Sequence, residues 1–293
     1  MKRILLLSGK GGTGKTTVSS ALIRLSQAKA VADCDVDAPN LHLVLQKKGA
    51  QTCSQVSEFF GGEKAAVDST LCTGCGRCEQ LCRFDAIHLV ENTAVVNLYS
   101  CEGCGVCSHV CPAGAVRLLP DVAGKKELYT GDRVFSTATL KMGRGNSGKL
   151  VTEVKKAMLK AAPPCELAIV DGSPGIGCPV IASVNGMDLV LVVAEPSGSG
   201  ISDLKRLCAT AATLQVQLAV CVNQYDVSPQ HTERIETFCR QQGIAFVGKI
   251  PFDPMAVRAA NEGTTVVDID CPAGGAVREI FAKLTALLAE RSI

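Results

Sequence analysis

Two groups of residues in this chain have types and spacings that could do chemistry, and the first is a glycine-rich run. Residues Gly9–Thr16 read GKGGTGKT and match the pattern G-x-x-x-x-G-K-[ST] between an apolar run, Ile4–Leu7, and a predicted helix, Lys15–Gln27. Glycines let successive backbone N–H groups curl around phosphate oxygens, and the following helix N-terminus adds partial positive charge. The pattern places Lys15 at the β- and γ-phosphates and the Thr16 hydroxyl on Mg²⁺. A ligand-free glycine turn is the alternative, and the complete motif in its strand–loop–helix setting favours a nucleotide site.

The second group is eight cysteines in two runs that each read C-x2-C-x2-C-x3-C, with each cysteine of the first run 29 residues before its counterpart. The runs are Cys72, Cys75, Cys78 and Cys82, then Cys101, Cys104, Cys107 and Cys111. This duplicated spacing resembles that of two-cluster ferredoxins, in which the fourth cysteine of each run ligates the other cluster. The ligand sets expected for two [4Fe–4S] clusters are therefore Cys72, Cys75, Cys78 and Cys111, and Cys101, Cys104, Cys107 and Cys82. Structural zinc is the rival reading.

Composition limits the classes of protein to which the chain can belong. It has 293 residues, of which 47% are hydrophobic and 20% charged, and a net charge of +2. These values fit a globular protein and give no reason to expect nucleic-acid binding. No apolar run approaches the ~20 residues that span a membrane. The sixteen cysteines occur without an export signal, so the sequence predicts a cytoplasmic protein with metal-bound thiolates rather than disulfides.

The elements around these groups are predicted to alternate between strands and helices. Asp33, Asp35 and Asp37 share one side at the end of a short strand, at the edge where parallel sheets bind ligands. Further strands are expected at 127–129 and 133–140, which form a hairpin, and at 167–171, 189–194, 217–223 and 245–250. Helices are expected at 147–160, with its lysines solvated, and at 201–214, 231–242 and 276–290, the last after a break at Gly274-Gly275. Residues 41–67 read as weakly extended, with a boundary at Gly61-Gly62.

The glycine-rich run resembles the deviant Walker A motif of the MinD/ParA/Mrp ATPases and the nitrogenase iron protein. The resemblance implies that Lys10 crosses a dimer interface to the nucleotide of the other subunit, so hydrolysis would require a homodimer or a heterodimer with a paralogue. It also implies that Asp35 orients the attacking water, with Asp33 and Asn40 completing that motif. The remaining implied nucleotide contacts are Gly11, Gly12, Thr13, Gly14 and Thr17 in the loop, Asp171 for Mg²⁺, Gly175 for the γ-phosphate and Asn223 for the base.

Cys178 lies ahead of Pro179 and a short predicted helix. A buried structural cysteine is the simplest reading. In the nitrogenase iron protein a cysteine in the corresponding region ligates a cluster shared across the dimer axis. The resemblance therefore carries the hypothesis that two Cys178 thiolates bridge a metal or cluster in a dimer, although no second cysteine of the kind used by the iron protein is evident here.

Together these features predict an α/β P-loop NTPase, a mostly parallel sheet flanked by helices, formed by residues 1–65 and 121–293. Residues 66–120 are predicted to be an inserted α+β ferredoxin domain with two [4Fe–4S] clusters. The resemblance implies an ATPase with ATP, Mg²⁺ and clusters as cofactors. Three outputs stay open: nucleotide-gated electron transfer to a redox partner, assembly or delivery of clusters to an acceptor protein, and a positioning switch like MinD or ParA. Neither nucleic acid nor a membrane is an expected partner.

Overall fold

The computed structural model describes residues 1–45 and 51–290, and the chain forms two compact units. One, the sheet unit, consists of Met1–Ser57, Lys126–Thr139 and Ser147–Ile293. The other, the cysteine unit, consists of Glu58–Lys125 and Leu140–Asn146. Residues 46–50, within the segment expected to be weakly extended, lie outside the described residues.

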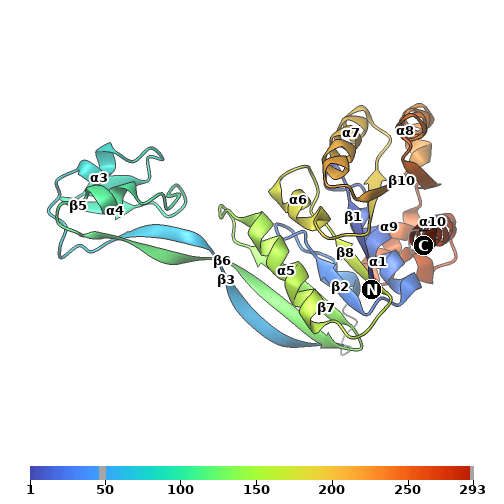
Figure 1. Cartoon of the computed structure of the whole chain (residues 1–293), viewed down its shortest axis with the longest axis horizontal. Coiled ribbons are helices and arrows are strands. Elements are labelled where there is room, and N and C mark those ends of the chain that lie inside the picture. Colours follow the sequence, from blue (N-terminus) through green and yellow to red (C-terminus); the bar gives the residue numbers. More distant parts are fainter. Residues whose placement is uncertain (46–50, 291–293) are drawn as a thin grey trace. The chain divides into compact units, whose positions relative to one another are not determined.

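The sheet unit is built on parallel strands (Figure 1). The strand order is β11-β10-β9-β1-β8-β2-β7-β6-β3, and the neighbouring pairs from β11 to β7 are parallel. The strands are β1 (Lys2–Leu7), β2 (Ala30–Asp33), β3 (Gln51–Val67), β6 (Val116–Gly131), β7 (Val134–Leu140), β8 (Leu167–Asp171), β9 (Leu189–Ala194), β10 (Gln217–Asn223) and β11 (Ala245–Ile250). Strands β3 and β6 continue beyond the sheet unit, since Glu58–Val67 and Val116–Lys125 belong to the cysteine unit. Strands β6 and β7 are joined by two residues, which confirms the predicted hairpin.

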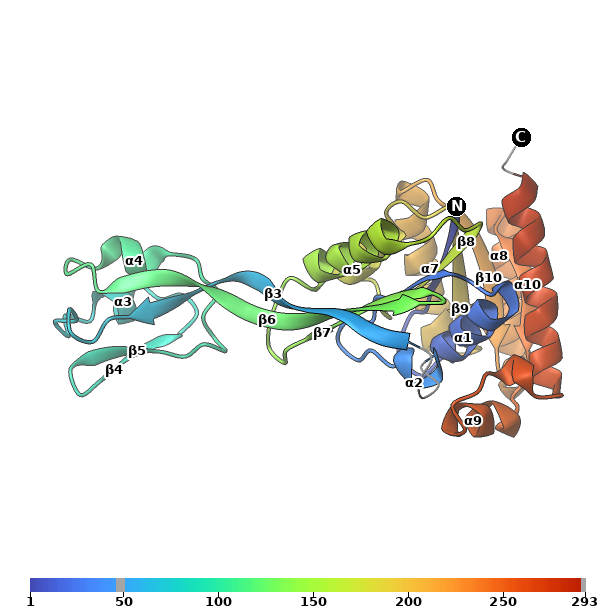
Figure 2. The same ribbon diagram turned by 90° about the horizontal axis from the view of Figure 1, so that it is seen from below.

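Helices cover both faces of this sheet because its central strands are apolar on both sides. The helices are α1 (Lys15–Ser26), α2 (His42–Leu45), α5 (Ser147–Ala161), α6 (Cys178–Val184), α7 (Gly198–Thr213), α8 (Pro229–Gln242), α9 (Pro254–Asn261) and α10 (Pro272–Glu290), with short 3₁₀ turns η1 (Tyr225–Val227) and η2 (Val266–Asp268). Helices α1 and α10 pack side by side on one face (Figure 2). Their apolar residues share a core with alternate residues of the strands. Helices α5 to α8 follow one another in contact. The mostly parallel α/β fold predicted from the sequence is confirmed.

Two predictions about glycines at element boundaries were wrong. Gly274 and Gly275 lie inside α10 instead of before it. The reason is packing, since a Cβ on Gly274 would lie 2.6 Å from the carbonyl oxygen of Val266. Gly61 and Gly62 likewise lie within β3 and do not end it. Helix α9 was not predicted.

The cysteine unit repeats its own backbone contacts at the 29-residue offset of its sequence. It contains α3 (Arg77–Gln80), α4 (Val106–Val110) and an antiparallel pair, β4 (Ile87–Val90) and β5 (Thr93–Val96). The N–H of Asp68 bonds the carbonyl of Ala115 at 2.8 Å, and its counterpart Asn97 bonds Ala86 at 2.7 Å. These bonds pair the start of each half with the end of the other. The duplication seen in the sequence is therefore also a structural one.

Lys155 on α5 corrects the expectation that the lysines of this helix are solvated. Its side chain is buried, and its ammonium donates to the carbonyl oxygens of Ala182 at 2.8 Å, Ser183 at 2.6 Å and Asn185 at 2.6 Å. These three acceptors lie at the C-terminal end of α6, where helix carbonyls lack partners within the helix. At the other end of α6 the backbones approach closely, because a Cβ on Gly148 would lie 3.2 Å from the carbonyl oxygen of Cys178. Helix α5 thus holds α6 at both ends.

The burial of Lys155 predicts a dependence of stability on pH. Burial is the main cause that lowers its pKa from 10.5 to about 8, with nearby Cys34 opposing the shift and Arg3 adding to it. Between those two values the unfolded chain binds a proton that the folded chain does not, so stability should rise with pH in this window and be independent of this group below it. We expect the wild type to gain roughly 1–3 kcal/mol from pH 7.5 to 10.5 relative to Lys155→Met, measured by denaturant unfolding. The neighbouring exposed Lys156, changed to Met, should follow the wild type; equal pH slopes for wild type and Lys155→Met would contradict the assignment.

Candidate functional site

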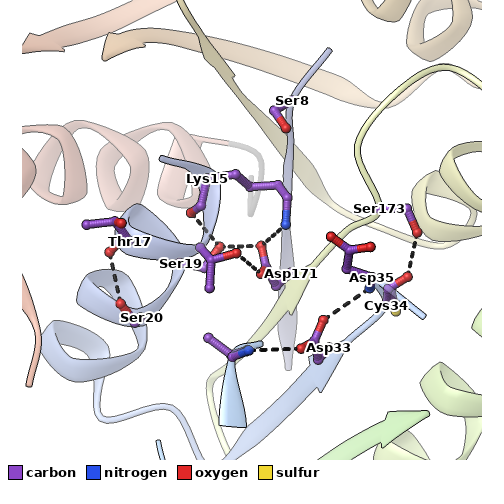
Figure 3. Close-up of polar contacts among 12 residues, drawn as sticks. Ser8, Lys15, Thr17, Ser19, Ser20, Asp33, Cys34, Asp35, Asp171 and Ser173 are labelled. Atoms are coloured by element: carbon purple, nitrogen blue, oxygen red, sulfur yellow. Dashed lines mark hydrogen bonds and ion pairs between the residues drawn. The ribbon is translucent and has the colours of Figure 1, made fainter. Parts of the chain in front are cut away.

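The glycine-rich run connects β1 to α1 and brings Lys15 onto Asp171 at the end of β8 (Figure 3). The Lys15 ammonium lies 2.7 Å from Asp171 Oδ1, and both side chains are buried. The Thr16 hydroxyl donates to Asp171 Oδ2 at 2.9 Å, and the Ser19 hydroxyl donates to Oδ1 at 2.6 Å. The expected Mg²⁺ ligands Thr16 and Asp171 therefore lie together. Ser19 was not predicted, although it follows Lys15 by one helical turn on the same face of α1.

Carboxylates crowd this lysine. Asp33 at the end of β2 is buried and accepts the backbone N–H groups of Asp35 and Leu41, each at 3.1 Å. Burial and the charge of Asp171 raise the pKa of Asp33 to about 7. Burial also raises the pKa of Asp35, with Lys15 opposing and Asp171 adding to the shift. Burial alone would lower the pKa of Lys15, but the ion pair and hydrogen bond with Asp171, together with the charges of Asp35 and Asp33, raise it overall. Three carboxylates around one ammonium leave excess negative charge that a divalent cation would neutralise.

The loop itself has room and free donors for phosphate. A cavity of about 520 Å³ is lined by the loop together with Asp35, Asp37, Asn40 and Pro174. The Thr13 hydroxyl is buried and has no hydrogen-bond partner among the described residues. A buried donor without a partner is costly, and a phosphate oxygen in the loop would supply one. Gly175, which follows β8, donates its N–H to the carbonyl of Ser8 at 2.9 Å and so lies against the start of the loop. These features fit a nucleoside triphosphate and its metal ion.

A second cavity, of about 270 Å³, adjoins the loop and suits a flat apolar group. Its lining includes Gly12, Gly14, Thr17 and Asn223, and on the other side Phe252, Val257 and Val277. The Asn223 amide donates to the carbonyl of Thr13 at 2.8 Å, so this residue is fixed to the loop while it lines the cavity. The apolar residues of the β11–α9 connection were not predicted, since nothing in their sequence spacing marks them.

Lys10 is bound within its own chain. Its ammonium lies 2.6 Å from Glu195 Oε1 and donates to the Ser199 hydroxyl at 3.3 Å. Burial opposes the shift, yet the bonds from Lys10 and Ser197 lower the pKa of Glu195 overall. Glu195 follows β9 at the same sheet edge as Asp33 and Asp171. The rule that ligands meet this edge could have drawn attention to it in the sequence.

The fourth cysteine of each run lies beside cysteines of the other run. Cys82 of the first run lines one cavity with Cys101, Cys104 and Cys107 of the second. Burial raises the pKa of Cys78, and the neighbouring Cys72 and Cys111 thiols contribute to the shift. The N–H groups of Ala86 and Ala115, again 29 residues apart, point to Cys82 Sγ at 3.4 Å and Cys111 Sγ at 3.3 Å. Within residues 1–45 and 51–290, no group of three or more His, Cys, Asp or Glu residues has the arrangement of a site for a metal ion.

Comparison with known proteins identifies a family whose profile spans most of the chain. The sequence profile of the CobQ/CobB/MinD/ParA nucleotide binding domain matches residues 4–266. The chain belongs to this family. It is 36% identical over 227 residues to the uncharacterized protein MJ0578 of Methanocaldococcus jannaschii, covering 76% of this chain and 78% of that one. It is 24% identical over 310 residues to an iron–sulfur cluster carrier protein of Pyrococcus abyssi, covering 98% and 87%.

Solved structures agree with this CobQ/CobB/MinD/ParA assignment at the level of the fold. The septum site-determining protein MinD of Pyrococcus horikoshii, solved with Mg-ADP, superimposes with a TM-score of 0.59 at 16% identity over 98% of this chain and 96% of that one. The nucleotide predicted from the loop agrees with the nucleotide binding domain that the family profile describes. Cys178 is exposed at the first residue of α6, so it is not the buried structural cysteine of the simplest reading. Across the described part of the chain, no helix combines the length and hydrophobicity needed to cross a bilayer.

Proposed function

We propose that this protein is an ATPase whose nucleotide-dependent dimer gates electron transfer through two [4Fe–4S] clusters. The observation that carries the proposal is the presence in one chain of a complete phosphate-binding loop and of two cysteine runs that exchange their fourth members. Residues 66–120 are proposed as the ferredoxin domain.

The nucleotide half rests on the chain's own residues. Loop N–H groups and Lys15 would bind the phosphates, and Thr16 and Asp171 would hold Mg²⁺, which neutralises charge on the phosphates. Asp35 lies at the same cavity as the loop and would orient the attacking water. Asn223 and the apolar cavity beside it would hold the base, and Gly175 would respond to the γ-phosphate. Lys10 would bind the nucleotide of a second subunit, a homodimer or a paralogue.

The cluster half rests on spacing, on the exchange of Cys82 and Cys111 between runs, and on backbone N–H groups that face thiols. When bound, [4Fe–4S] clusters supply one-electron redox steps. The chain would anchor them through thiolates and tune them through N–H···S bonds. A redox partner of unidentified class would accept the electron.

Delivery of clusters to an acceptor protein is the second candidate. Relatives named iron–sulfur cluster carrier proteins, such as that of Pyrococcus abyssi, favour it, and the exposed Cys178 would be its transfer ligand. A potential that differs between ATP and ADP states would support electron transfer, whereas movement of clusters to an apo-acceptor would support delivery. A MinD- or ParA-like positioning switch would instead show ATPase stimulation by a membrane or DNA.

Lys10→Ala tests the nucleotide half of the proposal. Since Lys10 would stabilise transition-state charge in the other subunit, we expect ATP-dependent dimerisation to be lost and hydrolysis to fall about 10³-fold or more, with nucleotide binding by the single chain retained. Size-exclusion chromatography with and without ATP measures the first and phosphate release the second. Lys249→Ala, which removes another exposed ion-paired lysine, is the control. A dimer that still forms with ATP in Lys10→Ala would contradict the proposal.

A further inference from the structure

The free subunit engages Lys10 with its own side chains. Ion pairing to Glu195 at 2.6 Å and the bond to Ser199 at 3.3 Å occupy the ammonium. The two residues that follow it border open space, because a Cβ on Gly11 or Gly12 would meet nothing within 4 Å. The Ser8 hydroxyl donates to the Lys10 carbonyl at 2.9 Å and fixes the backbone, so it is the Lys10 side chain that can leave Glu195.

Glu195, by contrast, is held in place. The Ser197 hydroxyl donates to Glu195 Oε1 at 2.6 Å and also accepts the Gly200 N–H at 3.0 Å as the cap of α7. A Cβ on Gly200 would lie 2.4 Å from the carbonyl oxygen of Glu195, so the chain is closely packed here. Glu195 also directly follows β9, and β9 pairs with β1, the strand that leads into the loop. The Glu195 carboxylate is thus held in one position, whereas the Lys10 side chain can move away from it.

One ammonium cannot make this ion pair and also extend to a nucleotide in another subunit. We propose that Glu195 is a positioning residue that retains Lys10 in the free subunit and thereby sets the protein concentration at which ATP-bound subunits associate. The inference rests on the proposed role of Lys10 between subunits. The Lys10 and Glu195 side chains are 42% and 27% exposed, so water screens the pair and triphosphate charge can displace it.

Glu195→Gln removes the charge but keeps an oxygen for Ser197. We expect ATP-dependent association to occur at about two- to five-fold lower protein concentration, with the ATPase midpoint shifted equally, as follows from the weakness of partly exposed pairs. The matched control is Glu236→Gln, which breaks the pair of Glu236 with Lys249 at 3.1 Å, whose side chains are 28% and 47% exposed. It should shift nothing. Ser199→Ala, which removes only the hydroxyl, should shift the midpoint less than Glu195→Gln.

A double-mutant cycle with Lys10→Ala separates this inference from the proposed function. If Glu195 acts through Lys10, Lys10→Ala and Lys10→Ala/Glu195→Gln behave alike. An unchanged or higher midpoint for Glu195→Gln, in a variant whose thermal unfolding matches wild type, overturns the inference while leaving the proposed function standing. ATP-dependent association of Lys10→Ala/Glu195→Gln under conditions where Lys10→Ala alone does not associate also overturns it. Normal ATP-dependent dimers in Lys10→Ala alone would overturn the proposed function itself.

Discussion

Replacing Lys15 with alanine is expected to abolish ATP hydrolysis and to destabilise the ligand-free protein by about 3–5 kcal/mol. The second effect follows from burial, since the Lys15 and Asp171 side chains are 6% and 0% exposed and their charged atoms are 2.7 Å apart. Removing the ammonium leaves the carboxylate buried, and among the described residues the Thr16 and Ser19 hydroxyls are its remaining hydrogen-bond donors. The first follows from loss of the main charge on the phosphates, for which a fall of at least about 10²–10³-fold is expected. Denaturant unfolding without nucleotide measures stability, and phosphate release measures hydrolysis.

Lys10→Ala is the matched control within the same loop. Lys10 is 42% exposed, and partly solvated ion pairs contribute about 0–1 kcal/mol, so this change should leave stability nearly unaltered. Two lysines five residues apart in one loop should therefore differ sharply in unfolding while both lose hydrolysis. Equal unfolding midpoints for Lys15→Ala and wild type would contradict the prediction, because they would mean that Lys15 does not stabilise the buried Asp171 carboxylate.

Pairs of cysteine-to-serine changes should reveal which thiols share a cluster. The anaerobically isolated protein is expected to hold about eight iron atoms per chain, as two [4Fe–4S] clusters require. Because Cys82 shares a cavity with Cys101, Cys82→Ser/Cys101→Ser should remove one cluster and retain about four irons. Cys82→Ser/Cys72→Ser should remove both, since Cys72 neighbours Cys78 and Cys111 instead. Iron analysis and EPR of the reduced protein measure the outcome.

Cys53→Ser is the control for these pairs, because Cys53 is exposed and outside both runs. It should retain the full iron content. The reverse pattern, in which Cys82→Ser/Cys101→Ser loses both clusters and Cys82→Ser/Cys72→Ser only one, would show that each run keeps its own fourth cysteine. Zinc in place of iron in the wild type would contradict the cluster proposal as a whole.

The sequence was most informative where a local pattern of residue types has a single structural interpretation. Asp171 was placed at a strand end and Lys15 at a helix start from local patterns, and the parallel sheet then brings them together. The duplication offset predicted which halves correspond, and the hydrogen bonds of Asp68 and Asn97 obey it. These features depend on short-range order that a sequence displays directly.

What the sequence did not predict depends on contacts between distant segments. Lys155 looks like a solvated lysine on a helix face, and only the packing of α6 over it turns it into a buried cap. Gly274 looks like a helix break, and only the approach of the Val266 carbonyl explains it. Glu195 is another such case, since its bond to Lys10 spans 185 residues of sequence. Helix propensity and periodicity carry no information about such pairs.

The contacts of α5 with α6 also limit how the chain could move in the proposed response of Gly175 to the γ-phosphate. Helix α6 begins directly after the segment Asp171–Gly177, and its ends are fixed by Gly148 and Lys155. A rearrangement driven by the γ-phosphate therefore cannot be absorbed by tilting α6 alone. It would be taken up at Gly175, where a Cβ would meet nothing within 4 Å, or by a joint movement of both helices, because Gly172 is packed against Leu5 and Leu7.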